Sequence, residues 1–218
     1  MGRRPLQRLW LARRIRHPLR RPGGRVLHAA GDRAVAVVLV ISADSPSTGE
    51  LLALDTRALE AVLADIAGQL AARGWMLATA ESCTGGLIAA ACTDLAGSSQ
   101  WFERGFITYS NAAKTELLGV PAALIATHGA VSEPVARAMA EGAVAHAHAQ
   151  VSVAVTGVAG PSGGSVAKPV GMVWFAWHLA GRTVSEVQQF AGDRQAVRAA
   201  TVRHAALRLA AGLASATP

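Results

Sequence analysis

Residues 75–86 read WMLATAESCTGG, an apolar run that passes into a turn of small and polar residues. Residues 75–79 are predicted to form a short buried strand, and residues 81–86 a tight turn at its end. The alanine-rich run at 87–95 then continues as a helix. The stretch therefore predicts a strand, a tight turn and a helix in direct succession.

The elements on either side of this stretch continue the alternation. Before it, four aliphatic residues recur about one helical turn apart and Gly74 follows them as a C-cap would; they are Leu59, Val62, Ile66 and Leu70. After it, the patterns predict a strand at 105–109, a helix at 111–118 opened by an Asn111 cap, and a helical turn from Pro121. A helix capped by Ser132 and reaching about 147 follows, and then a strand at 151–155. Paired strands at 170–177 and 183–190 and a helix capped by Asp193 and reaching about 213 complete the order. This order predicts an α/β fold, a three-layer α/β/α sandwich with a mixed β-sheet.

The charge of the chain is distributed unevenly. Half of the 218 residues are hydrophobic, which is enough for one buried core. The formal charge of +7 is confined to the first 50 residues, which carry ten arginines against three acids, whereas residues 51–218 carry eleven basic and eleven acidic residues. Because a neutral body has no evident means of tracking a phosphate backbone, we expect no nucleic-acid partner.

The first 50 residues also differ from the rest in composition. Nine arginines and no acid precede Val26, and a Pro-Gly-Gly sequence interrupts the segment at 22–24. We therefore predict an arginine-rich, poorly ordered extension at 1–50 and one domain at 51–218. The extension resembles a transit peptide, but a start codon set too far upstream or a basic arm that touches nucleic acid gives the same composition.

Cysteine usage and hydropathy indicate where the protein works. Cys83 and Cys92 form no CxxC pair, and the histidines do not cluster. This pattern indicates neither a disulfide framework nor a zinc site and fits a reducing compartment, so we expect a cytoplasmic protein without a metal. The best apolar run, at 34–42, is about half the length that a membrane helix needs, so we expect no membrane attachment.

Three segments have the composition of a reactive site, and the turn at 81–86 is the first. Its small residues bring consecutive backbone amides to a helix start, a place that suits an oxyanion hole or a phosphate. The alternative is that Ser82 and Thr84 cap the helix while Gly85 and Gly86 allow close packing. Cys83 adjoins Ser82 on the turn, so at most one of the two should face the site.

The second segment, at 109–114, reads YSNAAK. The chain has nineteen arginines but only two lysines, Lys114 and Lys168. Arginine keeps its proton in proteins, whereas a partly buried lysine can lose it and act as a base. Tyr109, the only tyrosine, is predicted to position the amine or to relay its proton. The alternative is a solvated lysine and a packed tyrosine.

The third segment, at 156–164, reads TGVAGPSGG and follows a predicted strand. It offers many backbone donors without bulk, although it matches neither the dinucleotide-binding nor the Walker spacing and could be a plain connection. All three turns would lie on one rim of the sheet, where ligands of α/β folds gather. A serine and a lysine in one such pocket form a known variant of the activated nucleophile.

Five phrases, in this order, carry a family resemblance: residues 79–86, residues 107–111 with Lys114, residues 129–132, residues 155–161 and residues 168–171. Across 59–213 the chain resembles the CinA C-terminal domain family, whose members include stand-alone nicotinamide-nucleotide amidohydrolases. Long members carry a further N-terminal domain related to molybdopterin-binding proteins, which 50 residues cannot hold.

The resemblance implies a reaction in which nicotinamide mononucleotide and water give nicotinic acid mononucleotide and ammonia, without a cofactor. It implies Ser82 as nucleophile, Lys114 as base and Tyr109 as an assisting residue. The residues that it implies for the oxyanion and the substrate are Cys83, Thr84, Gly85, Gly86, Asn111, Thr156, Gly157, Ala159, Gly160 and Arg194. Arg194 or Arg198 would meet the phosphate. We also expect a homo-oligomer.

Three alternatives stay open at this point. Cys83 could be the nucleophile in place of Ser82. The domain could be a silent nucleotide-binding module or an adaptor in the DNA-uptake or damage response that the family's name suggests. Finally, the basic head could make the chain a nucleic-acid-contacting protein.

Overall fold

The computed structural model describes the backbone of residues 48–216 and the side chains of residues 58–216. Residues 1–47, and with them nearly all of the predicted extension, lie outside this part of the chain. Within residues 48–216, no helix is both long and apolar enough to cross a bilayer.

A mixed five-stranded sheet forms the centre of the domain, with the strand order β2-β1-β3-β4-β5. The strands are β1 (Leu77–Glu81), β2 (Phe102–Ile107), β3 (Val151–Gly157), β4 (Met172–Leu179) and β5 (Arg182–Gln189). β1 pairs in parallel with β2 and β3, whereas β3, β4 and β5 pair antiparallel. The predicted mixed sheet and its closing hairpin are therefore confirmed, and the carboxyl ends of β1, β2 and β3 meet at one edge.

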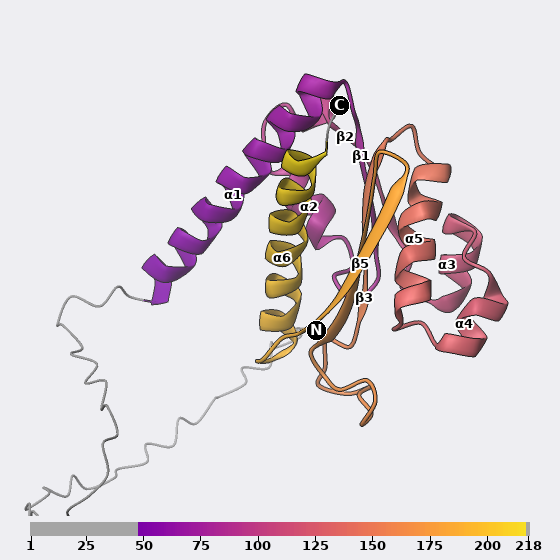
Figure 1. Ribbon diagram of the computed structural model, residues 1–218. Helices are drawn as coiled ribbons and strands as arrows, with labels where there is room; N and C mark the ends of the chain where they lie inside the picture. The colour runs from indigo at the N-terminus through magenta and orange to yellow at the C-terminus, as the bar shows by residue number, and fades with distance from the viewer. Residues whose placement is uncertain (1–47, 217–218) are drawn as a thin grey trace, which may run out of the picture. The chain divides into compact units, whose positions relative to one another are not determined.

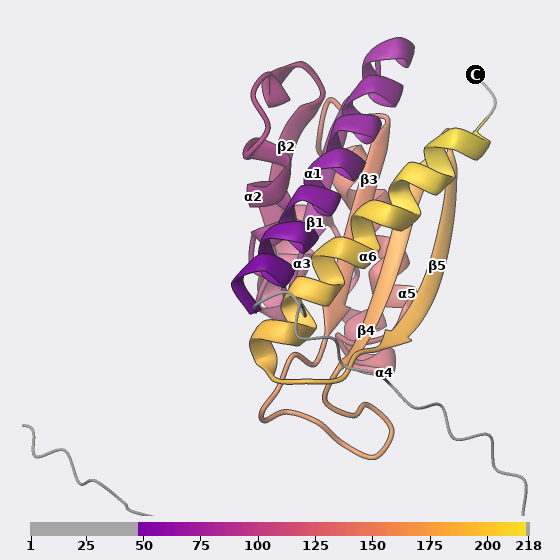
Figure 2. The same cartoon turned by 90° about the vertical axis from the view of Figure 1, so that its left-hand side faces the viewer.

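Helices cover both faces of the sheet (Figures 1 and 2). One face carries α1 (Thr48–Arg73), α2 (Leu87–Thr93) and α6 (Arg194–Ser215). The other carries α3 (Asn111–Leu118), α4 (Ala122–His128) and α5 (Glu133–Ala145), and a short 3-10 helix, η1 (Ser98–Gln100), precedes β2. The predicted three-layer α/β/α sandwich is confirmed.

The two faces of the sheet bury different side chains. Val151, Val153 and Val155 of β3 belong to the apolar cluster beneath α1, α2 and α6. On the opposite face, Ala80, Ala154 and Ala176 lie in register across three neighbouring strands. Because these side chains are small, α5, itself rich in alanine, can pack closely on the sheet.

The predicted bounds of the first two strands were wrong by two or three residues. β1 starts at Leu77 rather than at Trp75, because the amides of Gly74 and Trp75 close the end of α1 on the carbonyls of Ala71 and Leu70. Gly74 has a positive φ of 61° there, as the C-terminal cap requires. β2 ends at Ile107, so the residues after it belong to a turn. β1 also ends two residues later than predicted, so that its last residue is Glu81.

The caps of the helices agree only in part with the predicted ones. Asp193 caps α6 as predicted, since its carboxylate accepts the amide of Ala196 at 2.9 Å. The cap of α3 is Ser110 rather than Asn111, because the Ser110 hydroxyl accepts the amide of Ala113 at 3.0 Å. Ser132 occupies the cap position of α5, but its hydroxyl donates to the carbonyl of Gly129 instead.

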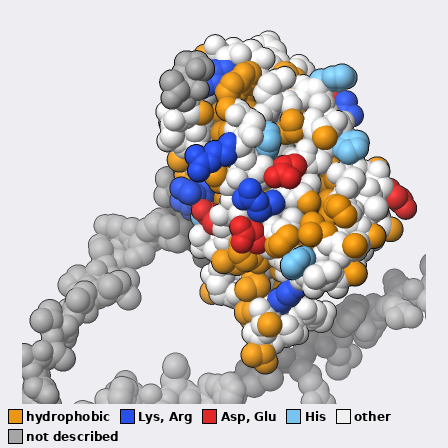
Figure 3. Space-filling model, turned by 45° about the vertical axis from the view of Figure 1, so that its right-hand side comes forward, with side chains coloured by type: hydrophobic (Ala, Val, Ile, Leu, Met, Phe, Trp, Pro, Cys, Tyr) orange, Lys and Arg blue, Asp and Glu red, His pale blue; other side chains and the backbone are white. Residues whose placement is uncertain are grey.

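One face of the domain mixes both signs of charge. Figure 3 views the molecule from the side of α3, α4 and α5, where Lys and Arg side chains lie beside acidic ones and among hydrophobic ones. This agrees with the equal numbers of basic and acidic residues in 51–218.

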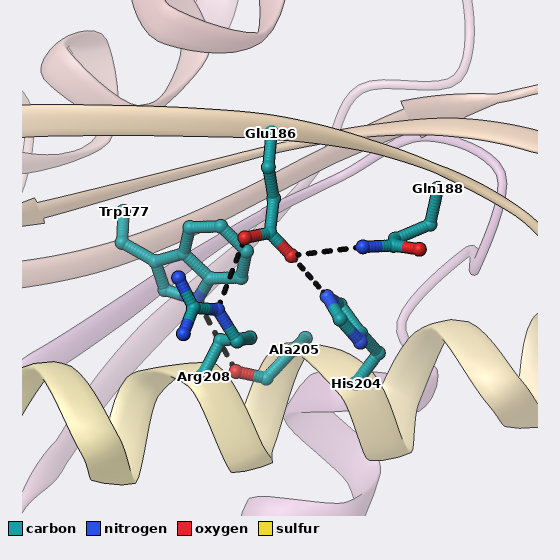
Figure 4. Close-up of polar contacts among 6 residues, drawn as sticks. All are labelled: Trp177, Glu186, Gln188, His204, Ala205 and Arg208. Carbon is teal, nitrogen blue, oxygen red and sulfur yellow. Dashed lines mark hydrogen bonds and ion pairs between the residues drawn. The ribbon is translucent and has the colours of Figure 1, made fainter.

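Polar contacts fix α6 against β5 (Figure 4). Glu186 of β5 accepts hydrogen bonds from His204 and, at 3.0 Å, from Arg208, both on α6. Trp177 of β4 donates its indole N–H to the carbonyl of Ala205 at 3.2 Å. These contacts hold the middle of α6, so the first turns of this helix have a defined position beside the sheet.

Candidate active site

The turns that follow the parallel strands lie next to each other at the carboxyl edge of the sheet. The amide of Ser82, just past β1, donates to the carbonyl of Val155 in β3 at 3.1 Å. The amide of Thr108, just past β2, donates to the carbonyl of Glu81 at 2.8 Å. The ladder between these strands thus continues one residue into the turns and fixes the backbone of Ser82.

Ser82 and Lys114 are 32 positions apart in the sequence, and they meet at this edge as predicted. Lys114 Nζ lies 3.0 Å from Ser82 Oγ and donates to the carbonyl of Thr108 at 2.8 Å. Lys114 is 1% exposed and Ser82 9% exposed, so the amine lies inside the protein and the hydroxyl at its boundary. Lys114 is one of the two buried residues of α3, so this helix carries the lysine side chain to the edge of the sheet.

The environment of the Lys114 amine favours its neutral form. Its two hydrogen-bond partners are a hydroxyl and a peptide carbonyl, neither of which carries a charge. Burial therefore lowers the pKa of Lys114 from its ordinary value. An uncharged amine 3.0 Å from a hydroxyl can accept its proton, which is the arrangement of a base and a nucleophile.

Glu81 is a buried residue of this site whose role the sequence analysis missed. Its side chain is fully buried and its carboxylate accepts five hydrogen bonds from uncharged donors. The donors are the hydroxyls of Thr79 and Thr84 and the amides of Gly86, Ile88 and Ala89. An acid five residues before the N-cap of a helix that has no capping side chain of its own is the signal that could have revealed it.

The bonds of Glu81 limit which amides of the turn can bind an oxyanion. The Gly86 amide donates to Glu81, and the Gly85 amide donates to the carbonyl of Ser82 at 3.2 Å. Among residues 58–216, no oxygen accepts the amide of Cys83 or of Thr84. Of the four turn residues predicted for the oxyanion or the substrate, these two are the ones whose amides donate to no oxygen, and both amides lie against the Cys83 thiol.

Cys83 lies on the other side of the turn from Ser82. It is 6% exposed and belongs to the apolar cluster beneath α2, whereas Ser82 contacts Lys114. Burial raises the pKa of the Cys83 thiol to about 12, so it is protonated at neutral pH. This agrees with the expectation that at most one of the two neighbours faces the site.

Tyr109 and Asn111 lie apart from the Ser82–Lys114 pair. Tyr109 is 62% exposed, and its hydroxyl accepts a bond from Arg194 at 3.1 Å. In the described part of the chain it makes no bond to Lys114, so its predicted action on the amine stays a prediction. Asn111 borders a separate groove between α3 and α4.

A cleft of about 920 Å³, lined in part by Leu87, opens next to the turn at 82–86, and neither Ser82 nor Lys114 is among its lining residues. Ala159, Gly160 and Pro161 form one wall, and Arg194 and Arg198 of α6 lie on the other. Two of the residues predicted from the third segment, Ala159 and Gly160, thus border an open space. The loop after β3 and the first turns of α6 therefore border one cleft, close to the turn after β1.

The two arginines of the cleft make different contacts. Arg194 donates from Nη1 to the carbonyl of Gly160 at 3.2 Å and from Nη2 to the Tyr109 hydroxyl. Arg198 donates from Nη2 to the carbonyl of Thr84 at 2.7 Å. Both guanidinium groups therefore stand at the cleft with donors to spare, a common arrangement for binding a phosphate.

Thr156 and Gly157 support the rim rather than border the cleft. The buried hydroxyl of Thr156 donates to the carbonyl of Ala130 at 2.8 Å. Gly157 ends β3 and pairs with Val173 of β4. Within the described residues, no three His, Cys, Asp or Glu side chains gather as metal ligands would.

Comparisons with known proteins agree on one family. The model described as "CinA C-terminal domain" matches residues 59–213. The nicotinamide-nucleotide amidohydrolase PncC of Enterobacter agglomerans is 54% identical over 146 residues, which are 66% of this chain and 89% of that protein. Its namesake from Pseudomonas putida is 60% identical over 124 residues, 57% of this chain and 78% of that one.

A solved structure extends the similarity to three dimensions. The competence damage-inducible protein A from Klebsiella pneumoniae has a TM-score of 0.71 and 43% sequence identity. The match covers 73% of this chain and 99% of that one. The shared fold therefore includes the strands and turns that bring the site together.

Proposed function

We propose that the chain, which belongs to the CinA C-terminal domain family, hydrolyses the carboxamide of nicotinamide mononucleotide to give nicotinic acid mononucleotide and ammonia. The observation that carries the proposal is the 3.0 Å contact between Lys114 Nζ and Ser82 Oγ, beside a cleft that holds two arginines. Relatives named for this activity share 54–60% of aligned residues with the chain. The reaction needs water and no cofactor.

Acylation begins with the transfer of the Ser82 hydroxyl proton to neutral Lys114. The Ser82 oxygen forms a bond to the carboxamide carbon, and the carbonyl oxygen becomes an oxyanion. The amides of Cys83 and Thr84 are the donors that we propose for this oxyanion. The C–N bond then breaks, the nitrogen takes the proton from Lys114, and ammonia leaves an ester on Ser82.

Deacylation repeats these steps with water. Water loses a proton to Lys114 as its oxygen bonds to the ester carbon, and the ester C–O bond then breaks. The Ser82 oxygen recovers its proton from Lys114, and nicotinic acid mononucleotide is released. The carbonyl of Thr108 holds the amine throughout, because a fixed acceptor at 2.8 Å keeps Nζ within reach of both reactants.

The phosphate of the substrate has a basic partner in the cleft. Arg194 and Arg198 stand one helical turn apart on α6, and both border the open space. A dianionic phosphate there would receive charge-assisted hydrogen bonds from guanidinium donors. With the phosphate at α6, the ring amide of the substrate would extend toward Ser82.

The structure favours Ser82 over Cys83 as nucleophile. A thiol that is buried among apolar side chains, with a pKa of about 12, has almost no thiolate to offer at neutral pH. A silent nucleotide-binding module remains the second candidate from another class, and turnover separates it from the enzyme. The third alternative concerns the basic residues of the segment 1–50, all of which lie outside the described residues 48–216.

We further propose that the enzyme is a cytoplasmic homo-oligomer. Cys83 and Cys92 are unpaired, which suits a reducing compartment. β5 is an edge strand and exposes Val184 and Val187, apolar side chains that a second copy could cover. Light scattering at several concentrations tests the assembly, and a strictly monomeric mass would contradict it.

The direct test of the activity is ammonia release from nicotinamide mononucleotide. We expect turnover by the wild type and a loss of about 10⁴-fold or more in Ser82→Ala. Ser132→Ala is a matched control, because it removes an equally buried hydroxyl that bonds a carbonyl in another loop. Full turnover by Ser82→Ala would remove the assigned nucleophile, and binding without turnover by the wild type would favour the silent module.

A further inference from the structure

Arg198 connects the cleft with the nucleophile turn. Its Nη2 donates to the carbonyl of Thr84 at 2.7 Å, a contact between residues 114 positions apart. The same atom lies 3.8 Å from where a Cβ on Gly85 would stand. The guanidinium therefore lies along the backbone of the turn, two residues after Ser82.

The Arg198 guanidinium also has a donor that is not satisfied. Its Nε is buried, and within residues 58–216 it has no hydrogen-bond partner. Leaving a buried donor of a charged group unpaired costs free energy, so such groups normally meet a partner. Nε itself is closed off, but Arg198 also borders the cleft, so an anion bound there can reach the outer Nη donors of the same guanidinium.

The nucleophile turn needs a restraint of this kind. Gly85 and Gly86 follow each other with φ angles of 61° and 100°, a backbone region that glycine enters easily and leaves as easily. Thr84 is held on both sides, since its hydroxyl donates to Glu81 at 2.7 Å and its carbonyl accepts from Arg198. The first contact is buried, whereas the second is part-buried and belongs to a side chain that borders the cleft.

We propose that Arg198 is a positioning residue that couples binding of the substrate's phosphate to the geometry of the nucleophile turn. A phosphate monoester that binds the free side of the guanidinium fixes Arg198, which fixes the Thr84 carbonyl and with it the peptides that follow Ser82. The inference deepens the proposed function and rests on it. Its consequence is that the phosphate raises kcat rather than only lowering KM.

The experiment divides the substrate into two pieces. Nicotinamide riboside is the substrate without its phosphate, and phosphite dianion is the missing piece. For the wild type we expect kcat with riboside to be about 100-fold below that with mononucleotide, and phosphite to raise riboside turnover about tenfold. In Arg198→Ala, kcat with mononucleotide falls about 100-fold, riboside turnover falls by no more than about tenfold, and phosphite has no effect.

Two further variants distinguish positioning from charge and from folding. Arg198→Lys keeps a positive charge but has no planar fork to span the phosphate and the Thr84 carbonyl, so KM for mononucleotide stays within about threefold while kcat falls about tenfold. Arg208→Ala removes an arginine from the same helix far along from the cleft, and it retains the phosphite effect. Thermal melting checks that each variant is folded.

Two outcomes overturn the inference. Equal losses of mononucleotide and riboside turnover in Arg198→Ala would mean that the residue only maintains the structure. A higher KM for mononucleotide with unchanged kcat would mean that Arg198 binds phosphate without acting on the turn. If the wild type releases no ammonia from mononucleotide, the proposed function itself has failed, which is a result distinct from both.

Discussion

The two lysines of the described domain occupy opposite situations at neighbouring strand ends. Lys114, beyond β2, is 1% exposed and lies between the Ser82 hydroxyl and the Thr108 carbonyl. Lys168, in the loop between β3 and β4, is half-exposed and donates to the carbonyl of His128 at 2.7 Å. Burial beside a hydroxyl turns the first amine into a candidate base, whereas the second is an anchor.

The anchor has its own part in the site. Lys168 fastens the loop after β3 to the turn between α4 and α5, where Gly129 leaves room for the amine. The same loop contributes Gly160 and Pro161 to the cleft. The comparison therefore predicts two functions of lysine, with one amine in the proposed chemistry and the other shaping the cleft.

Replacing Lys114 by arginine tests the first half of this contrast. Arginine does not lose its proton in proteins, so Lys114→Arg is expected to lower kcat by about 10⁴-fold in the ammonia assay. Lys168→Arg is the matched control, since it keeps a donor for the His128 carbonyl and should stay within about threefold of the wild type. Comparable kcat values for the two variants would erase the distinction between base and anchor.

The pH dependence of kcat sharpens the same contrast. Burial lowers the pKa of Lys114, and in the proposed mechanism the neutral amine is the active form. The rate should therefore rise about tenfold per pH unit below that pKa and level off above it, with a midpoint below the ordinary lysine value. Steady-state kinetics in overlapping buffers measures it; a rate that falls as the pH rises would contradict a lysine base.

Removing the anchor should have a smaller and different effect. Lys168→Met deletes the bond to His128 while keeping most of the side chain's bulk, so the cleft wall becomes less well held. We expect KM for mononucleotide to rise about tenfold while kcat stays within about threefold, because the chemical groups are untouched. A fall in kcat without a change in KM would show that Lys168 acts in the chemistry as well.

The smallest effect is expected at the thiol beside the nucleophile. Burial raises the pKa of Cys83 to about 12, so iodoacetamide should leave the activity of the native protein unchanged. Peptide mapping should find both cysteines modified only after unfolding in urea. Rapid inactivation together with modification of Cys83 would reopen its role as nucleophile.

Much of the architecture follows from the sequence because the signals are local. The order and type of the elements, the cap at Asp193 and the proximity of Ser82 to Lys114 were all predicted. The start of β1 was not, because the amide of Trp75 serves the end of α1 instead of a strand. The periodicity of a sequence reveals the apolar residues of such a segment, but it does not reveal which partners the backbone amides bond.

The parts of the site that were missed depend on tertiary contacts. In the sequence Glu81 has the appearance of an ordinary turn residue. Its role follows from the fold, in which amides at the start of α2 donate to its carboxylate. Tyr109 stands five residues before Lys114 in sequence, yet its hydroxyl meets Arg194, 85 positions away. Spacing along the chain indicates that such residues are close in space but not which way their side chains point.

The central claim is that a neutral lysine makes Ser82 a nucleophile, and the ester on Ser82 is its most direct product. Rapid acid quenching of the enzyme with nicotinamide mononucleotide, followed by tandem mass spectrometry, measures that ester. We expect an acyl group on Ser82 in the wild type and none in Lys114→Arg. An acyl group on Cys83, or a completed first turnover with no enzyme-bound ester at any quench time, would contradict the mechanism.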